Sequence, residues 1–586
     1  MGRRSHDGRS QKFHPLDHQF GEETRDWRNS PSGHVRRSCI IFDFNQDHGM
    51  TWTPHAPLTR EETLLSVRAG DLDALECTFD AQWYDLPDQF ADEVMRTLGD
   101  VPADVLERRP RLTHLALLAQ RRQAYARGDD DAVSRSFQLY VRAGLRSVRR
   151  LDRLSRLPDT LCAGTAAVVA HRSRRDYASS ERVGAWLDAR AQDAPHAALP
   201  WAAIRPAARP GWLSAQRGIT AMLSGADDAA ATLFSRAAEE AGDRPSAHYA
   251  RVTATAHLAL LGAYRGHHRL AWRHLERLAD EPPFPDWVAS AHMGADALAS
   301  AQLAIDEGDP ETARAILAEY EALAPHRPDL WAFHAHVLAC YHAHYGDPLR
   351  GLREIDELRL LHGVVGRESD TFLGRVALRG EAKLLVRAGG AGRVLQLAHE
   401  HDPNDEWLST HHAWAHLVLG ETVEAISLAS SALRRAPLSP NDALGLHVVN
   451  AVAHLRAGRE DKARAWFQRA LRLRATPRQV APFLGMRPEE RETLERLAGV
   501  SSLLPGGSTV VDHNVLGVAL AERLSPRERV VLEALCEGCT AEQAAERFSV
   551  SINTVRTQIR HIYRKLGVTS RREAVAAARE LGLVAA

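Results

Sequence analysis

Over residues 56–495, apolar residues recur at helical spacing and are separated by short breaks of Gly, Asp or Pro. An α-helix returns to the same face every 3.6 residues, so this spacing places the apolar residues on one face of each helix. Alternation with a period of two, which would indicate β-strands, is nearly absent. The pattern therefore predicts an all-α protein built from many short helices.

Several of the breaks contain a glycine that is followed, five residues later, by an alanine. Glycine permits the tight turn between two antiparallel helices, and a small alanine lets the second helix approach the first closely. A proline further on ends the second helix. The Gly/Ala pairs are Gly225/Ala230, Gly266/Ala271, Gly308/Ala313, Gly420/Ala425 and Gly458/Ala463. They predict a helical-repeat solenoid, with irregular α-helical packing as the alternative.

One of these segments, residues 458–470, resembles the tetratricopeptide repeat in its glycine, alanine, aromatic and alanine positions. Those positions are Gly458, Ala463, Phe467 and Ala470. Gly308 and Gly420 begin weaker matches, and Gly70 and Gly128 indicate similar turns. The resemblance implies a tetratricopeptide-like array whose concave surface receives a peptide, a protein or a small ligand.

The segments that flank this region have a different composition. Residues 1–55 are polar, rich in Arg and His, and without sustained periodicity, which predicts a disordered N-terminal extension. Met50 lies just before the first helical pattern, so the first 49 residues are either an extension that the cell does not make or a disordered functional tail. Residues 496–520 are rich in Ser, Gly and Val and predict a linker to a separate domain over residues 521–586.

Composition and charge limit the cellular compartment and the partners that the chain could have. The chain carries 74 Lys and Arg against 75 Asp and Glu, so a nucleic-acid site has to be sought locally. No stretch reaches the roughly 18 to 20 apolar residues of a membrane span, and the N-terminus lacks the apolar segment of a signal peptide. The six cysteines are sparse and do not suggest a disulfide framework. These features predict a cytoplasmic protein with no membrane contact.

The C-terminal domain contains the start signals of four helices. Ser525 with Glu528 and Thr540 with Gln543 have the spacing of capping boxes, in which two side chains satisfy free backbone N–H groups. Further caps are expected at Ser551, for a helix that runs to about Leu566, and at Ser570. The side chains expected to point inward from the first and last of these helices are Val530, Val531, Ala534, Leu535, Ala574, Val575, Ala578 and Leu581.

The third of these helices has two distinct faces. One is an apolar stripe with spacings of four, three and four residues, formed by Val555, Ile559, Ile562 and Leu566. The other is a cationic face with a spacing of four, formed by Arg556, Arg560 and Arg564. From Ser551 to Arg572 there are six Lys or Arg residues and no Asp or Glu. Such a helix suits the major groove of DNA, where the forked donors of arginine pair with guanine O6 and N7.

At this point the sequence resembles the LuxR/NarL-type helix-turn-helix family. The matching features are Leu524 to Glu528, Gly538, Ala545 to Arg547, Ser551, Thr554 to Arg556, Ile562, Lys565 to Val568, and Arg571 to Ala574. The resemblance covers about 60 residues, and Ala544 and Gln558 depart from the residues usual in the family. It implies a four-helix DNA-binding domain whose last helix supports a homodimer on double-stranded DNA.

The resemblance also implies roles for individual residues. Arg556, Thr557 and Arg560 match positions that face base edges. Thr554 and Lys565 match positions that hold phosphates, and Gln558 retains a side chain able to bond a phosphate. The predicted DNA-binding residues are Ser551, Thr554, Arg556, Thr557, Gln558, Arg560, Arg564 and Lys565.

Some cysteines and histidines have a spacing that could suggest a metal site. Cys536 and Cys539 have C-x-x-C spacing without a second ligand pair, which favours packing residues over a zinc site, with a redox switch as the alternative. Histidines two residues apart on one helix point about 200° from each other, so the histidine-rich segments cannot gather on one metal and are expected to be solvated or tuned by protonation. Those histidines are His334, His336, His342, His344, His411 and His412. We therefore expect no metal and no cofactor.

The motifs of common enzymes are missing, including the G-x-x-x-x-G-K-[ST] loop of ATPases.

The arrangement resembles regulators that join a tetratricopeptide-like sensor to a LuxR-type domain, here without an ATPase domain. The predicted function is a sequence-specific transcriptional regulator whose repeat region senses an effector, namely a peptide, a protein or a small molecule. The alternative is a helical scaffold for protein assembly in which DNA binding is secondary or lost. A third hypothesis, an enzyme within the helical region, would require a polar pocket with a strongly shifted titratable group.

Overall fold

The computed structural model describes most of the chain from Arg60 onward. The described residues are 40–41, 55–56, 60–192, 209–243, 247–323, 327–362, 371–400, 407–435, 438–504, 524–548, 550–566 and 568–580. The disordered extension predicted over residues 1–55 lies outside them, apart from β1 (Ile40–Ile41) and the start of β2 (His55–Ala56), which pair antiparallel. Of the predicted linker, residues 505–520 also lie outside the described part.

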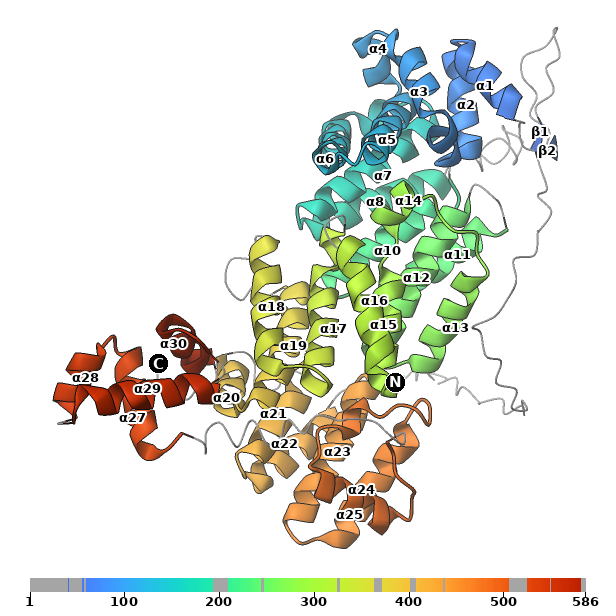
Figure 1. Cartoon of the computed structure of the whole chain (residues 1–586). Helices are drawn as coiled ribbons and strands as arrows, with labels where there is room; N and C mark the ends of the chain where they lie inside the picture. The colour runs from blue at the N-terminus through green and yellow to red at the C-terminus, as the bar shows by residue number, and fades with distance from the viewer. Residues whose placement is uncertain are drawn as a thin grey trace, which may run out of the picture. The chain divides into compact units, whose positions relative to one another are not determined.

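From Arg60 onward the described chain is helical, as the sequence predicts (Figure 1). Helices α3, α5, α6, α7 and α8 each pack against the next in this order. The core beside α3 and α5 includes the aromatic side chains of Phe79, Trp83 and Tyr84. The elements of this part are α1 (Arg60–Arg68), α2 (Leu72–Gln82), α3 (Asp85–Gly99), α4 (Ala103–Arg108), α5 (Pro110–Ala126), α6 (Asp130–Ser147), the 3₁₀ helix η1 (Val148–Arg153), α7 (Leu157–Ser173) and α8 (Tyr177–Gln192).

The following part consists of successive helical pairs. The pairs are α10 (Trp212–Ser224) with α11 (Asp227–Ala241), α12 (His248–Arg265) with α13 (His268–Ala279), α15 (Ala295–Glu307) with α16 (Pro310–Leu323), α17 (Trp331–His344) with α18 (Pro348–Leu361), α19 (Phe372–Ala388) with α20 (Ala391–Glu400), α21 (Ser409–Val418) with α22 (Thr422–Arg435), and α23 (Pro440–Arg456) with α24 (Glu460–Leu473). The first helix of each pair packs against the first helix of the next pair. This stacking of neighbours is the arrangement of a helical-repeat array.

Short elements connect or end these pairs. They are α14 (Asp286–His292), the 3₁₀ helices η4 (Pro328–Leu330) and η5 (Ala481–Phe483), and α25 (Pro488–Ala498). Helix α25 packs on α24 and ends inside the segment predicted to be a linker. No helix among the described residues has the length and apolar character needed to cross a membrane.

The glycines and alanines of the sequence repeat occupy the expected places. All five glycines adopt positive φ angles, between 69° at Gly458 and 86° at Gly225 and Gly266. Such angles are open to glycine and strained for other residues. The five alanines at plus five are fully buried where the second helix crosses the first. Gly70 and Gly128 also have positive φ and form turns between helices, as predicted.

The sequence pattern of glycine followed by alanine does not identify two of the helical pairs, α17 with α18 and α19 with α20. Gly389 has a φ of 87°, but Val394 stands five residues after it instead of alanine. Gly346 is followed five residues later by Gly351, where an added Cβ would lie 2.8 Å from the Cβ of His342. The physical requirement for a small residue at the crossing is therefore met at Gly351 without the alanine.

The C-terminal domain contains four described helices. These are α27 (Pro526–Cys536), α28 (Ala541–Arg547), α29 (Ile552–Leu566) and α30 (Arg571–Glu580). Helix α29 packs against both α27 and α28, and α30 packs against α27 and α29 (Figure 1). The count and order of helices agree with the four-helix domain expected from the sequence.

Candidate nucleic-acid interface

Both predicted capping boxes are present at the starts of α27 and α28. The Ser525 hydroxyl accepts a bond from the Glu528 N–H at 3.3 Å, and the Glu528 carboxylate accepts one from the Ser525 N–H at 2.7 Å. Thr540 and Gln543 bond reciprocally in the same way, at 3.2 and 2.8 Å. These bonds satisfy backbone donors that have no partner within the helix. The two helices that support α29 therefore begin at fixed residues.

The turn between α27 and α28 and the start of α29 follow the sequence prediction. Gly538 has a φ of 95°, which ends α27 in a left-handed turn. The Ser551 hydroxyl accepts a bond from the Thr554 N–H at 3.1 Å and so caps α29. At the start of α30, the Ser570 hydroxyl accepts from the Glu573 N–H at 3.2 Å.

The apolar stripe of α29 packs into the domain core, as predicted. Val555, Ile562 and Leu566 are buried and Ile559 is partly buried. From the neighbouring helices, the core receives Leu524, Val531, Leu532, Ala534, Ala544, Ala545, Ala574 and Ala578. Burial of the apolar stripe fixes the rotation of α29 about its axis. The opposite face of α29 must then point outward.

Two of the predicted inward side chains, Val530 and Val575, are not in this core, and Val575 is half-buried outside it. Val530 is 42% exposed, whereas its neighbour Val531 is buried. Successive residues of a helix differ by about 100°, and Val530 falls outside the buried stripe set by Val531, Ala534 and Leu535. The prediction for Val530 was therefore wrong, while Leu581 lies outside the described residues.

The outward face of α29 carries the cationic side chains. Arg556, Arg560 and Arg564 are exposed at successive turns, and Thr557 is exposed beside them. Gln558 is half-buried at the edge of this face. Within the described part of the chain, Arg560 and Arg564 have no carboxylate within 4.0 Å, so their guanidinium groups are available to an anionic ligand.

Arg556 is paired with a residue that the sequence analysis did not select. Its Nη2 donates to Oε1 of Glu542 on α28 at 2.9 Å, and both side chains are more than half exposed. A solvent-exposed ion pair of this kind contributes little to stability, because water screens both charges. Arg556 can therefore exchange Glu542 for another partner at small cost.

Lys565 lies at the inner edge of the helix rather than on the open face. Its ammonium group donates to Oε2 of Glu528 at 2.5 Å, and its side chain is 26% exposed. Burial raises the pKa of Glu528, whereas the bonds from Lys565 and Ser525 lower it by a larger amount. The pKa of Glu528 therefore lies below its ordinary value. The contact ties the end of α29 to the start of α27.

Ser551 and Thr554 form the N-terminal edge of the same surface. Their hydroxyl groups are 2.8 Å apart and both side chains are exposed. Arg571, which also belongs to the basic segment, donates instead to the Leu535 carbonyl at 3.1 Å and holds α30 against α27. The structure thus brings Ser551, Thr554, Arg556, Thr557, Arg560 and Arg564 to one open surface.

The cysteines and histidines weighed as ligands lie in packed surroundings. Cys536 and Cys539 are partly buried against the core of the C-terminal domain. His336 packs edge-on against Tyr264, whereas His342 bonds Glu354 at 2.9 Å. Among the described residues, no group of three or more His, Cys, Asp or Glu side chains has the arrangement of a metal site.

Comparison with known proteins places the C-terminal domain in a family. Residues 522–578 match the family described as "Bacterial regulatory proteins, luxR family". A curated relative, the "Probable transcriptional regulatory protein SgaR" of Hyphomicrobium methylovorum, is 44% identical over 66 residues. That match spans 11% of this chain and 31% of the relative. No solved structure matches the chain.

Proposed function

We propose that this protein is a sequence-specific transcriptional regulator that binds double-stranded DNA through its luxR-family domain. The observation that carries the proposal is the outward face of α29, where Arg556, Arg560 and Arg564 project from a helix whose opposite side is buried. An α-helix fits the major groove, and arginine pairs with guanine there. Phosphate contacts by Ser551, Thr554, Gln558 and Lys565 complete the proposed interface.

The proposal assigns a role to each contact. Arg556, Thr557 and Arg560 face the bases, and Arg556 leaves Glu542 when it binds. Lys565, which donates to Glu528, is the proposed phosphate contact at the end of α29. Two copies of the chain, joined through α30, bind two half-sites about one helical turn apart. The protein acts in the cytoplasm, where bacterial DNA is found.

The helical array is proposed to be the sensing part of the molecule. Its stacked pairs resemble tetratricopeptide repeats in the positions of Gly458, Ala463 and Phe467. An effector shifts an equilibrium only when it binds two states with different affinity. We infer that effector binding to the array changes dimerisation or the exposure of α29.

Selection of genomic DNA fragments by the purified full-length protein tests the DNA-binding proposal. Wild type is expected to enrich a shared palindromic site, and the double variant Arg556→Ala, Arg560→Ala to lose it, because each bidentate base contact is worth about 1 to 3 kcal/mol. Arg527→Ala, which removes an exposed charge from α27 outside the proposed interface, serves as the control and should retain the site. Recovery of the same unspecific fragments by all three proteins would favour the scaffold hypothesis.

A further inference from the structure

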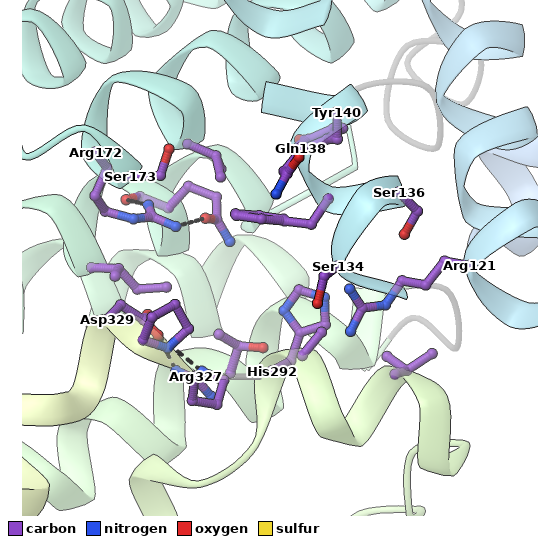
Figure 2. Close-up of a pocket in the computed structure, with 18 of the residues that line it drawn as sticks. Arg121, Ser134, Ser136, Gln138, Tyr140, Arg172, Ser173, His292, Arg327 and Asp329 are labelled. Atoms are coloured by element: carbon purple, nitrogen blue, oxygen red, sulfur yellow. Dashed lines mark hydrogen bonds and ion pairs between the residues drawn. The ribbon is translucent and has the colours of Figure 1, made fainter. Parts of the chain in front are cut away.

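A cavity of about 500 Å³ lies inside the helical array (Figure 2). Its walls come from α5, α6, α7, α10, α12 and α14 and from the segment around η4, which are far apart in the sequence. Ligand pockets for small organic molecules usually have volumes of about 300 to 1,000 Å³ and mostly apolar walls with a few polar groups. The size of this cavity therefore suits one small organic molecule.

Large apolar side chains form much of the wall. Trp212, Trp287 and Trp331 line the cavity. Each is buried, with 6%, 2% and 5% of its surface exposed in that order. Ile219 and Leu223 of α10 lie beside them. Flat aromatic walls favour a ligand with a planar apolar body. A simple inorganic anion would leave this surface without a partner.

Two arginines supply positive charge within the same cavity. Figure 2 shows Arg121 of α5 and Arg172 of α7 extending toward the same space from opposite sides of the view. Arg172 donates to the backbone and side-chain oxygens of Gln216, at 3.0 and 2.8 Å. Arg121 has a long contact of 3.4 Å to the Ser290 hydroxyl. Neither guanidinium has a carboxylate within ion-pair distance among the described residues.

A third arginine of the cavity is already neutralised. Arg327 donates to Asp329 from Nε at 3.1 Å and from Nη2 at 3.4 Å, and its Nη1 donates to the Met293 carbonyl. Burial raises the pKa of Asp329, but the charge and hydrogen bond of Arg327 hold it down at about 2. Asp329 is thus charged and engaged with Arg327. The positive charges of Arg121 and Arg172 remain in excess.

The cavity also contains a buried acceptor without a partner. His257 of α12 is fully buried, and its Nδ1 lies 2.7 Å from the Thr253 carbonyl, to which it donates. Burial lowers the pKa of His257 to about 4, so the ring is neutral and its Nε2 is an acceptor. Nε2 of His257 and Nε of Arg121 are both buried with no hydrogen-bond partner among the described residues. Buried polar atoms in this state are costly unless a ligand bonds them.

We propose that this cavity binds an aromatic carboxylate, with the carboxylate at Arg121, the ring beside the tryptophans, and a hydroxyl or N–H donor at His257. The carboxylate and the donor of this ligand would bond Nε of Arg121 and Nε2 of His257, which have no hydrogen-bond partner among the described residues. Guanidinium groups bind carboxylates through paired hydrogen bonds. That this ligand is the effector of DNA binding rests on the function proposed above, whereas its binding does not.

Isothermal titration calorimetry on the full-length protein tests the site with defined probes. The carboxylates are 4-hydroxybenzoate and indole-3-acetate, and the matched neutral probes are 4-hydroxybenzamide and indole-3-acetamide. At least one carboxylate is expected to bind saturably, and its amide about tenfold or more weakly, as for loss of a hydrogen bond to a charged group. Inorganic phosphate, which lacks the ring, should bind no more tightly than the amide.

Variants assign the binding to this cavity. Arg121→Gln is expected to weaken the carboxylate about tenfold or more, and Arg142→Gln, which changes an exposed arginine of α6, to leave it unchanged. Ser134→Trp, which fills the cavity from α6 without altering a charge, should abolish binding. Heats that are absent for both carboxylates, equal for acid and amide, or unaltered in Arg121→Gln and Ser134→Trp would overturn the proposal.

A second titration separates the pocket from its regulatory role. The fragment selected by wild-type protein is titrated with and without the bound carboxylate. Altered DNA affinity in wild type, and none in Ser134→Trp, supports an effector role. Carboxylate binding with unaltered DNA affinity overturns that role while it supports the pocket, and loss of DNA binding in every sample overturns the proposed function alone.

Discussion

Glu542 is the residue that holds Arg556 in the free protein. The pair lies on the surface, so water already screens both charges and little energy is needed to separate them. A carboxylate beside a DNA-binding face also repels phosphates. If the proposed interface is right, Glu542 should therefore weaken DNA binding without shaping the core of the domain.

This role leads to a prediction at the residue scale. Glu542→Gln should raise the affinity for DNA by up to about fivefold, because it releases Arg556 and removes a negative charge from a weak, screened ion pair. Glu546→Gln, which makes the same change at another exposed position of α28, is the control. Fluorescence anisotropy with a labelled duplex measures both affinities. Equal affinities of the two variants would show that Glu542 has no special position.

Single residues also show which side-chain positions the sequence could predict. The burial of Val555, Ile562 and Leu566 follows from their spacing, since one helix face must be covered. Val530 is as apolar as these residues but lies about 100° from Val531 around the helix. Only the packing of the complete domain shows that Val530 is exposed. The pairing of Arg556 with Glu542 joins two helices and has no local signal.

At the scale of single elements, caps and turns determine where helices begin and end. The first turn of α27 combines a capping box with the bond from Lys565, so one carboxylate joins the start of α27 to the end of α29. Glu528 is nearly completely buried there. Its loss should loosen α27 and the attachment of α29 together.

The corresponding prediction concerns local stability and its dependence on pH. Glu528→Ala should destabilise α27 by about 0.5 to 2 kcal/mol, as for loss of a helix cap. Because the folded pKa of Glu528 lies below its ordinary value, its contribution is present above the unfolded pKa and is lost as the pH falls through the folded pKa. Hydrogen exchange of the α27 amides in the full-length protein measures this at neutral and acidic pH.

Glu533→Ala, at an exposed position of α27, is the control for that experiment. It should exchange like wild type after correction for helix propensity. Amides of α27 that exchange equally fast in wild type and Glu528→Ala at neutral pH would contradict the capping account.

The close crossing of helices within a pair leads to a further prediction. Ala463 is fully buried where α24 crosses α23, whereas Ala465 of the same helix is exposed. Ala463→Leu should destabilise this pair by about 1 to 3 kcal/mol or more, because a larger side chain overpacks the contact. Ala465→Leu makes the same change in helix propensity without the crowding. Urea unfolding followed by circular dichroism compares the two, and equal midpoints would refute the close-crossing account.

At the scale of the whole molecule, the sequence predicted what depends on neighbours along the chain. The all-α class, the glycine turns at Gly308, Gly420 and Gly458, and the four helices of the C-terminal domain all follow from local spacing. The cavity could not be predicted in this way. Its arginines lie on α5 and α7 and its histidine on α12, and only the stacking of pairs brings them together.

The central claim is that the luxR-family domain of this chain reads a DNA sequence. Its most direct test is the ratio of affinities for the selected palindromic fragment and for a shuffled duplex of equal length, both measured at physiological salt. A specific regulator is expected to bind the selected fragment about a thousandfold or more tightly. Arg560→Ala should reduce that ratio by about fivefold to a hundredfold and leave the shuffled duplex less affected. Equal affinities of wild type for both duplexes would contradict the account.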